Sequence, residues 1–384
     1  MEPQNKSAKI DNELYYLATL SGCNGIGSKL TRLLEKMSPK ELWAASETDL
    51  ISRDILSSAN IASYLESRKK LDVDKTAQQI EKLGIKITHI YSDTYPDALR
   101  AIPKPPIILF YKGKYGLDIF DKSIAVVGTR NPTDYGVKAT DDIVSSLAAE
   151  GINIVSGMAM GIDSEAHKAT LDSGGTTTAI LGCGLNIVYP ASNRKLYERI
   201  IENGLIISEF LPSVTPQQWH FPQRNRLISG LSKGVIVIEG SHDSGSISTV
   251  EHALEQGRTV FALPGSIYTK QSEAPNKLIK DGAVPILRYT DILDELDWSS
   301  TQTKSEKVKV KNKQNKLDED INKLAGLEKN ILELFKSSGE STLSAEYIHQ
   351  KLNSSASEVS MALLQLELSD IITKKSGGLY SLLG

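Results

Sequence analysis

The most regular alternation of apolar and polar positions runs from residue 123 to residue 287. Short continuous apolar stretches alternate there with longer stretches whose apolar residues recur at helical spacing. The first pattern is typical of strands buried on both faces, and the second of helices that bury one side. The predicted strands are Ile124–Val127, Ile152–Val155, Thr177–Leu181, Leu205–Glu209, Val235–Glu239, Thr259–Leu263 and Ala283–Leu287. The predicted helices are one opening at Pro132 and Asp134, then Ser164–Ser173, Asn193–Glu202, Arg224–Leu231, Ser246–Gln256 and Pro275–Lys280. This order predicts an α/β fold with a doubly wound parallel sheet.

The stretch before this alternation has weaker patterns. Residues 11–68 predict a small helical domain with a turn at Ser21-Gly22-Cys23-Asn24-Gly25-Ile26-Gly27-Ser28, which is the helix-hairpin-helix pattern. The amides of such a turn can contact a DNA phosphate, but a plain packing hairpin has the same pattern, and both interpretations stay open. The elements predicted in the bridge at 71–118 are a helix at Lys75–Leu83 and strands at Ile85–Tyr91 and Ile107–Tyr111.

The C-terminal part begins with a lysine-rich linker, residues 299–320, which has six lysines between Lys304 and Lys316. Residues 321–384 then predict a winged helix. Its elements are helices at Leu327–Phe335, Ser344–Leu352 and Ser357–Leu366, and strands at Ile371–Lys374 and Leu379–Leu382 around a wing tip at Lys375–Gly378. The third helix contains no arginine or lysine, so we expect a scaffold or protein-contact role rather than reading of base edges. The predicted division is therefore 1–70, 71–298, 299–320 and 321–384.

Composition limits the class of protein. The chain has 384 residues, of which 40% are apolar and 24% charged, as in soluble globular proteins. We expect neither a signal peptide nor a membrane span, because the N-terminus is polar and no apolar run approaches ~20 residues. Cys23 and Cys183 fit a reducing cytoplasm, and the scattered histidines predict no metal site and no cofactor. The net charge of −3 means that binding to nucleic acid would need a local basic patch.

The candidate functional residues lie in the loops that follow the predicted strands. Gly128, Thr129 and Arg130 follow the first strand, and a glycine-containing loop leads to Asp163 after the second. Glycine lets backbone amides approach a phosphate, and arginine offers a planar charged fork. Because parallel strands end at one edge of the sheet, these groups predict one anion site there. The predicted phosphate or DNA contacts are Gly128, Thr129, Arg130, Gly157, Gly161, Asp163, Arg194, Arg224, Asn225, Arg226, Ser244, Gly245 and Ser246.

Two of these groups have a second interpretation. Arg224 and Arg226 stand at the start of a predicted helix, where positive charge opposes the helix dipole, so either an anion or a nearby acid is expected to compensate. Ser244 and Ser246 precede another helix and can cap it or contact a phosphate. Aromatic residues at Tyr189 and 219–221 offer faces for stacked bases, which favours single strands, although we expect Phe221 to belong to the core.

Several common nucleotide sites are absent from the sequence. The dinucleotide fingerprint needs a second glycine where Arg130 stands, and an acid where the second strand ends in Ser156 and Gly157. No Walker loop with Gly-Lys-Ser/Thr occurs, and no Gly-x-Ser-x-Gly nucleophile elbow occurs. The loops therefore predict phosphate binding without a dinucleotide or a hydrolase site.

The motifs between residues 80 and 295 resemble the DprA/Smf family, the DNA-processing proteins of bacterial natural transformation. They are VGTRNPTDYG, SGMAMGIDSEAH, AILGCGLNIVYP, ISEF, FPQRNRLISGLS, VIVIEGSHDSGSISTVEHALEQGR, VFALPGS and NKLIKDGA. The resemblance implies an extended Rossmann domain that binds and protects incoming single-stranded DNA and helps to load the recombinase RecA. It also implies a helix-hairpin-helix or SAM-like N-terminal domain, a C-terminal winged helix and a homodimer, with Leu278, Ile279 and Val284 as its candidate contacts.

The chain departs from the family pattern at Ser272-Glu273-Ala274-Pro275-Asn276, and at Ala191, where some members have lysine. The main alternative is a nucleotide-processing enzyme of the same superfamily, similar to the phosphoribohydrolases and their Pro-Gly-Gly-x-Gly-Thr-x-x-Glu motif. Here the position that matches the catalytic glutamate holds His252, and Glu251 lies one position away, about 100° around the helix. A transcription factor that uses the winged helix is a third alternative. We expect a binding protein rather than an enzyme.

Overall fold

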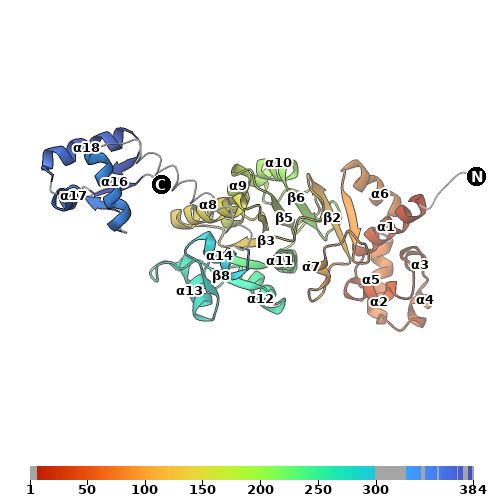
Figure 1. Cartoon of the computed structure of the whole chain (residues 1–384). Coiled ribbons are helices and arrows are strands. Elements are labelled where there is room, and N and C mark those ends of the chain that lie inside the picture. The colour runs from red at the N-terminus through yellow and green to blue at the C-terminus, as the bar shows by residue number, and fades with distance from the viewer. Residues whose placement is uncertain are drawn as a thin grey trace, which may run out of the picture. The chain divides into compact units, whose positions relative to one another are not determined.

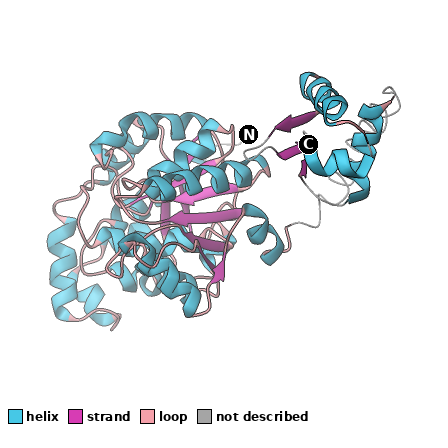
Figure 2. Cartoon of the chain, turned by 90° about the vertical axis from the view of Figure 1, so that its left-hand side faces the viewer, coloured by secondary structure: helices cyan, strands magenta, loops and turns pink. Residues whose placement is uncertain are grey.

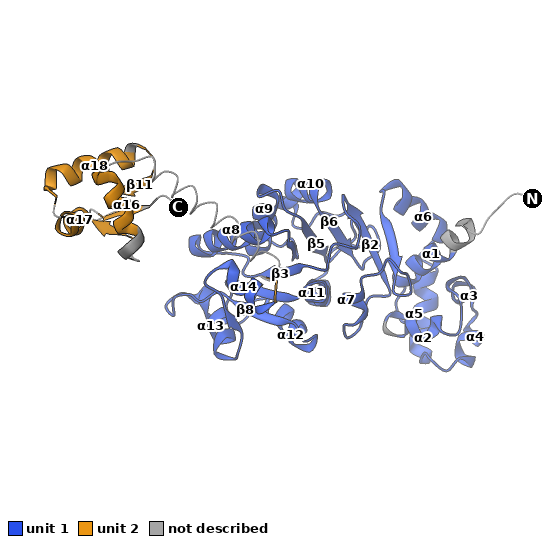
Figure 3. Cartoon of the chain, viewed as in Figure 1, with its two compact units in different colours: residues 1–296 blue, residues 297–384 orange. Residues whose placement is uncertain are grey.

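The computed structural model describes residues 7–298, 326–338, 342–352, 354–369, 371–374 and 379–382. The chain forms two compact units, residues 1–296 and residues 297–384 (Figure 3). The predicted linker and the predicted wing tip at Lys375–Gly378 lie outside the described residues. The division of the first unit at residue 70 stays a prediction.

The first unit is built on a nine-stranded sheet in the order β1-β2-β6-β5-β4-β3-β7-β8-β9 (Figure 1). Its strands are β1 (Lys86–His89), β2 (Ile108–Gly113), β3 (Ser123–Val127), β4 (Asn153–Ser156), β5 (Thr177–Leu181), β6 (Leu205–Ser208), β7 (Gly234–Val237), β8 (Thr259–Ala262) and β9 (Val284–Pro285). The seven strands predicted after residue 122 are confirmed, and all seven run parallel. The two strands of the predicted bridge join the same sheet, where β2 pairs antiparallel with both β1 and β6.

Helices cover both faces of this sheet (Figure 2). One set of helices consists of α8 (Asp134–Ala149), α9 (Ile162–Asp172) and α10 (Arg194–Asn203), in which α9 packs against both α8 and α10. The other set consists of α11 (His220–Gly230) and α12 (Ile247–Glu255), which pack against each other. From β3 the chain adds strands in one direction up to β6, then crosses back to β7 and adds strands in the other direction. Right-handed crossovers therefore place the two sets of helices on opposite faces, and β3 and β7 form the switch point of the sheet.

The N-terminal helices share a hydrophobic core with one face of the sheet. They are α1 (Ser7–Ser21), α2 (Leu30–Leu34), α3 (Pro39–Ala44), α4 (Glu47–Ser52), α5 (Ser58–Arg68) and α6 (Val73–Lys82). Leu17, Ile26 and Tyr64 belong to the same buried cluster as Phe110 of β2. Gly25 has φ +81°, and a Cβ there would meet the carbonyl oxygen of Asn60 in α5. The glycine turn therefore packs closely on α5, which is the role expected of a packing hairpin.

The remaining short helices of the first unit are α7 (Asp97–Arg100), α13 (Glu273–Lys280) and α14 (Tyr289–Glu295). The second unit contains α16 (Leu327–Ser338), α17 (Ala345–Leu352), α18 (Ala356–Leu368), β10 (Leu343–Ser344), β11 (Ile372–Lys374) and β12 (Leu379–Leu382). Its three strands pair in the order β10-β12-β11 around a core that includes Ile331, Leu363 and Ile372. Ser344 caps α17, because its Oγ accepts a hydrogen bond from the Tyr347 amide at 3.1 Å.

No helix in the described part of the chain is both long enough and apolar enough to cross a membrane.

Candidate functional site

A cleft of about 680 Å³ opens at the carboxyl edge of the sheet, where β3 and β7 lie next to each other. Its walls come from the loop after β3 (127–131), the loop after β7 and the first turn of α12 (241–249), and the start of α11. Ala159 and Asp163 contribute from the connection between β4 and α9, and Tyr189 from the loop after β5. The cleft therefore lies at the switch point, the usual ligand site of an open α/β sheet.

The loop after β3 has a fixed backbone and an exposed arginine. The Thr129 amide donates a hydrogen bond to the carbonyl of Glu239 at 2.7 Å, and the Ile162 amide donates to the carbonyl of Thr129 at 3.1 Å. Gly161 has φ +79°, and a Cβ there would collide with the carbonyl oxygen of Thr129. Arg130 is exposed at the cleft, and its side chain has no ion pair within the described ranges. Its guanidinium is therefore free to bind an anion.

Arg224 lies at the buried base of the cleft and is only 4% exposed. Its Nη1 donates hydrogen bonds to the carbonyls of Gly157, at 2.8 Å, and Ile180, and its Nε donates to Oδ1 of Asn225 at 3.2 Å. Burial lowers the pKa of the Arg224 guanidinium to about 10, and Asp163 opposes this change. Arg224 therefore stays charged at neutral pH, and it binds the backbone of the two neighbouring strand ends.

Asp163 supplies the opposite charge. It is 7% exposed, and its Oδ2 accepts hydrogen bonds from the amides of Gly157 at 3.1 Å and Ala159 at 3.4 Å. Burial raises the pKa of the Asp163 carboxyl, while the positive charge of Arg224 opposes the rise. A Cβ on Gly157 would lie 2.6 Å from Nη2 of Arg224, so only glycine lets the guanidinium approach this strand end. Arg224, Asp163 and Gly157 thus form an internal network that shapes the base of the cleft.

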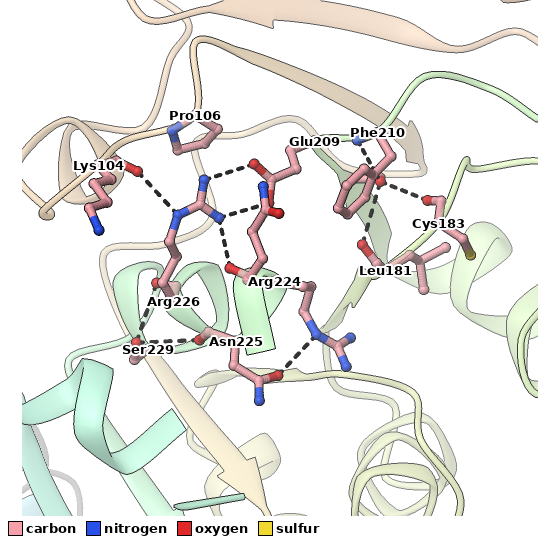
Figure 4. A network of polar contacts seen from close by, with 12 residues as sticks. Lys104, Pro106, Leu181, Cys183, Glu209, Phe210, Arg224, Asn225, Arg226 and Ser229 are labelled. Atoms are coloured by element: carbon pink, nitrogen blue, oxygen red, sulfur yellow. Dashed lines mark hydrogen bonds and ion pairs between the residues drawn. The ribbon is translucent and has the colours of Figure 1, made fainter. Parts of the chain in front are cut away.

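Arg226 does not line the cleft and belongs to a second network (Figure 4). Its Nη1 and Nη2 each bind one carboxylate oxygen of Glu209 at 2.7 Å, and both side chains are close to 10% exposed. It also donates to the carbonyls of Lys104, at 3.1 Å, and Gln223, at 2.8 Å. This bidentate pair joins α11 to the end of β6 and to the segment before β2.

The expectation that the two arginines begin a helix is wrong. α11 begins at His220, so Arg224 and Arg226 both lie in its second turn. At that position their charges do not meet the positive end of the helix dipole, whose effect is confined to the first turn. Each has an acid nearby, the buried Asp163 for Arg224 and the partly buried Glu209 for Arg226.

The serine-rich loop after β7 forms another wall of the cleft. Oγ of Ser244 and Oγ of Ser246 lie 2.8 Å apart, and the Ser246 side chain makes no capping hydrogen bond to α12. Asn225 fixes the loop from α11, because its Nδ2 donates to Oγ of Ser248 at 2.7 Å and to the carbonyl of Gly245 at 3.3 Å. Ser244 and Ser246 line the cleft, and the Ser246 hydroxyl does not cap α12.

Tyr189 and Phe221 form an aromatic wall. Their rings are stacked with centroids 5.4 Å apart and planes inclined by 30°. Tyr189 is 44% exposed, and Phe221, expected in the core, is half-buried and lines the cleft. The wall stands with Arg130 and the serine loop around one cavity, so an aromatic group and an anion of one ligand can be bound together.

The structure brings together most, but not all, of the residues predicted for the site. Those that line the cleft are Gly128, Thr129, Arg130, Asp163, Arg224, Asn225, Ser244, Gly245 and Ser246. Gly157 and Gly161 lie behind the wall and permit its close packing. Arg194 is exposed at the start of α10 and does not line the cleft, and neither does Arg226. Glu239 was not predicted as a residue of the site. The feature that could have indicated it is an acid at the end of an apolar strand.

Two acids, Asp163 and Asp243, line the cleft. Glu251, the candidate acid of the enzyme alternative, is exposed on α12 and does not line the cavity. Asp163 does line it, but its carboxylate is held by two amides beside Arg224. Among the described residues, no three His, Cys, Asp or Glu side chains are grouped as metal ligands.

Comparison with known proteins gives the family. The family model described as DNA recombination-mediator protein A matches residues 86–297. The chain belongs to the DNA recombination-mediator protein A family. It is 36% identical over 283 residues to the DNA processing protein DprA of Bacillus subtilis, a match that covers 71% of this chain and 95% of that protein.

Two solved structures of the family are similar to this chain. The X-ray structure of DprA from Streptococcus pneumoniae matches with a TM-score of 0.64 and 36% identity, over 74% of this chain and 97% of that one. A structure of DprA from Helicobacter pylori, a protein described as having a unique single-stranded DNA binding mode, matches with a TM-score of 0.50 and 31% identity, over 55% of this chain and 95% of that one. The DprA-like α/β fold and the N-terminal helical region fit these structures.

The departure from the DprA pattern at 272–276 is accommodated locally. Nδ2 of Asn276 donates to the carbonyl of Gly265 at 3.0 Å, and its Oδ1 accepts from the Gly265 amide at 3.1 Å. Pro275 lies in the first turn of α13, where a missing amide hydrogen removes no bond within the helix. The asparagine thus fixes the loop after β8 despite the proline.

Proposed function

We propose that this chain binds single-stranded DNA in the cleft between β3 and β7. The observation that carries the proposal is the exposed Arg130, without an ion pair in the described part of the chain, in one cavity with the stacked Tyr189–Phe221 wall. Arginine binds a backbone phosphate, and an aromatic face stacks a base that has left its own stack. A duplex hides the faces of its bases, so this combination favours a single strand. Family membership and the single-stranded DNA binding described for the Helicobacter pylori protein support the same ligand for this chain.

The predicted contacts take two roles in this proposal. Residues of the walls, namely Gly128, Thr129, Arg130, Ser244, Gly245 and Ser246, contact phosphates through amides, hydroxyls and the guanidinium. Gly157, Gly161, Asp163, Arg224 and Asn225 shape the walls through the buried network. Arg226 contributes stability through Glu209. Arg194 stands outside the cleft and is not among the proposed contacts.

The biological setting is also a proposal. Binding and protection of incoming strands during natural transformation, followed by loading of RecA, fit a cleft that binds DNA without a catalytic group. We place this protein in the cytoplasm, without a membrane partner or a cofactor. The helical N-terminal region is proposed to be helix-hairpin-helix or SAM-like, and the second unit a winged helix with a scaffold role, because α18 has Glu358 and Glu367 but no basic residue.

A homodimer is proposed at the β9 edge of the sheet. Leu278, Ile279 and Val284 are half-buried there, so part of each side chain is available to a second copy. Ile267 and Leu287 flank the same end of the sheet and are 81% and 79% exposed. An apolar edge of this kind is typical of an interface between subunits.

Arg130→Ala is expected to weaken binding of a labelled oligothymidine by at least about tenfold, since a charge-assisted hydrogen bond contributes about 1.5–3 kcal/mol. The slope of log affinity against log salt should also fall by about one phosphate contact. Fluorescence anisotropy at several salt concentrations measures both quantities.

Arg194→Ala is the matched control, because it removes the same charge from an exposed arginine outside the cleft. The control should bind with nearly the wild-type affinity and slope. Equal losses in the two variants would mean that the cleft is not the binding site, and an unchanged Arg130→Ala variant would mean the same.

A further inference from the structure

Glu239 is a buried acid next to the cleft that the proposed contacts do not include. It follows β7, is 1% exposed and does not line the cavity. Among the described residues, its carboxylate forms no ion pair with a Lys, Arg or His side chain. A buried carboxylate without a cation is costly unless hydrogen bonds satisfy it, so its partners indicate its purpose.

The partners of Glu239 all belong to the arginine loop and to the start of α8. Oε2 accepts a hydrogen bond from the Thr133 amide at 2.9 Å, and Oε1 accepts from the Thr133 hydroxyl at 2.6 Å. The backbone carbonyl of Glu239 accepts from the Thr129 amide at 2.7 Å. Thr133 in turn caps α8, because its Oγ1 accepts from the Gly136 amide at 3.2 Å. The helix dipole adds a favourable interaction with the carboxylate.

One residue therefore fixes both ends of the loop that bears Arg130. The backbone carbonyl of Glu239 binds Thr129, and the carboxylate of Glu239 binds Thr133. Arg130 lies between these two threonines and has no ion pair in the described structure. Gly136 leaves room for the carboxylate, since a Cβ there would collide with Oε2. The carboxylate of Glu239, the Thr133 side chain and Gly136 thus pack together at the end of the loop that leads into α8.

The same carboxylate occupies the positive end of α8. In a dinucleotide-binding sheet, the pyrophosphate lies at the N-terminus of the helix after the first strand. Here Glu239 already binds that end, so a phosphate in the cleft is left to the exposed guanidinium of Arg130 and to the serine loop.

We propose that Glu239 is the positioning residue for Arg130, and that it sets the affinity of the cleft for single-stranded DNA without touching the strand. This inference rests on the proposed function. Its specific consequence is coupling: the contribution of Glu239 to binding passes through Arg130 and disappears when Arg130 is removed.

A double-mutant cycle measures this coupling. Oligothymidine affinities are compared for the wild type, Glu239→Gln, Arg130→Ala and the double variant, by anisotropy at a salt concentration where all four bind. Glutamine keeps the size of the side chain but cannot accept both hydrogen bonds from Thr133. We expect Glu239→Gln to weaken binding by about tenfold and to lower the salt slope. In the Arg130→Ala background, the same substitution should change affinity by less than about twofold.

Two variants of Thr133 test the same hydrogen bond by changing the partner of Glu239. Thr133→Val removes the hydroxyl that binds Glu239 and should reproduce the Glu239→Gln loss, while Thr133→Ser keeps the hydroxyl and should bind like the wild type. They also give the answer if Glu239→Gln does not fold, which circular dichroism of each variant shows.

The outcomes separate this inference from the proposed function. Equal losses from Glu239→Gln with and without Arg130 would overturn the positioning role, as would an unchanged affinity of Glu239→Gln beside a weakened Arg130→Ala. In both of those cases the cleft would remain the DNA site. If Arg130→Ala itself binds like the wild type, the proposed function and this inference both fail.

Discussion

Replacing Arg226 by alanine is expected to lower the free energy of unfolding of the first unit by about 3–5 kcal/mol. The substitution leaves the Glu209 carboxylate, which is only 10% exposed, without the two hydrogen bonds that Arg226 gives it at 2.7 Å. It also removes donors from the carbonyls of Lys104 and Gln223. A loss of this size should lower the unfolding temperature by about 5–8 °C.

Urea denaturation followed by tryptophan fluorescence tests this result, since Trp43 and Trp219 report on the first unit. Arg194→Ala, which removes an exposed arginine, should change stability by less than about 0.5 kcal/mol. The double variant Arg226→Met with Glu209→Met should recover part of the loss, because no unpaired charge remains buried. The structural role of the pair would be contradicted by an Arg226→Ala chain that is as stable as the wild type but has lost affinity for DNA.

Replacing Arg224 by methionine is expected to have a similar cost, about 3–5 kcal/mol, and one that depends on pH. The guanidinium is 4% exposed and binds the carbonyls of Gly157 and Ile180 beside Asp163. Burial already raises the pKa of Asp163, and without Arg224 it should rise further. An acid whose pKa is higher in the folded chain than in the unfolded chain loses stability as the pH rises through that interval. The deficit of Arg224→Met should therefore be largest at neutral pH and shrink towards pH 5.

The control is Arg224→Met combined with Asp163→Asn, which removes the titrating group. Its deficit relative to the wild type should vary much less between pH 5 and pH 7, and denaturation at both pH values measures it. A deficit of Arg224→Met that grows as the pH falls would show that Asp163 is not the acid that Arg224 stabilises.

Strands and most helices could be predicted because their signals are local. The continuous apolar run at 124–127 becomes a strand with both faces buried, and similar runs give the other parallel strands. What the sequence could not show is which strands are neighbours. β2 looked like part of a bridge between domains, yet it pairs with β6, whose residues lie about ninety positions later. Pairing of this kind depends on the folded sheet and leaves no local pattern.

The start of α11 was missed for a local reason. The predicted helix begins at Arg224, but α11 begins at His220 and includes Pro222 in its first turn, where proline is tolerated. Trp219 precedes the helix without a capping side chain, so no serine, threonine or aspartate marked the boundary. The shift moved two arginines from the expected helix start to positions one turn further along.

The type of residue alone could not separate the three arginines. Arg130, Arg224 and Arg226 all follow strands and all suit a phosphate, but their partners decide their surroundings. Glu209, which neutralises Arg226, directly follows β6, and the carbonyls that bind Arg224 belong to β5 and to the residue after β4. Glu239 escaped notice for the same reason, since its partner Thr133 is more than a hundred residues away in sequence.

Photo-cross-linking tests most directly whether a single strand lies in this cleft. A single strand that carries 5-iododeoxyuridine is bound to the full chain and irradiated, and the attached peptides are mapped by mass spectrometry. We expect attachment at Tyr189 or Phe221, which is lost with excess unlabelled single strand but kept with excess duplex. Attachment only to residues outside the cleft, or equal competition by duplex, would contradict it.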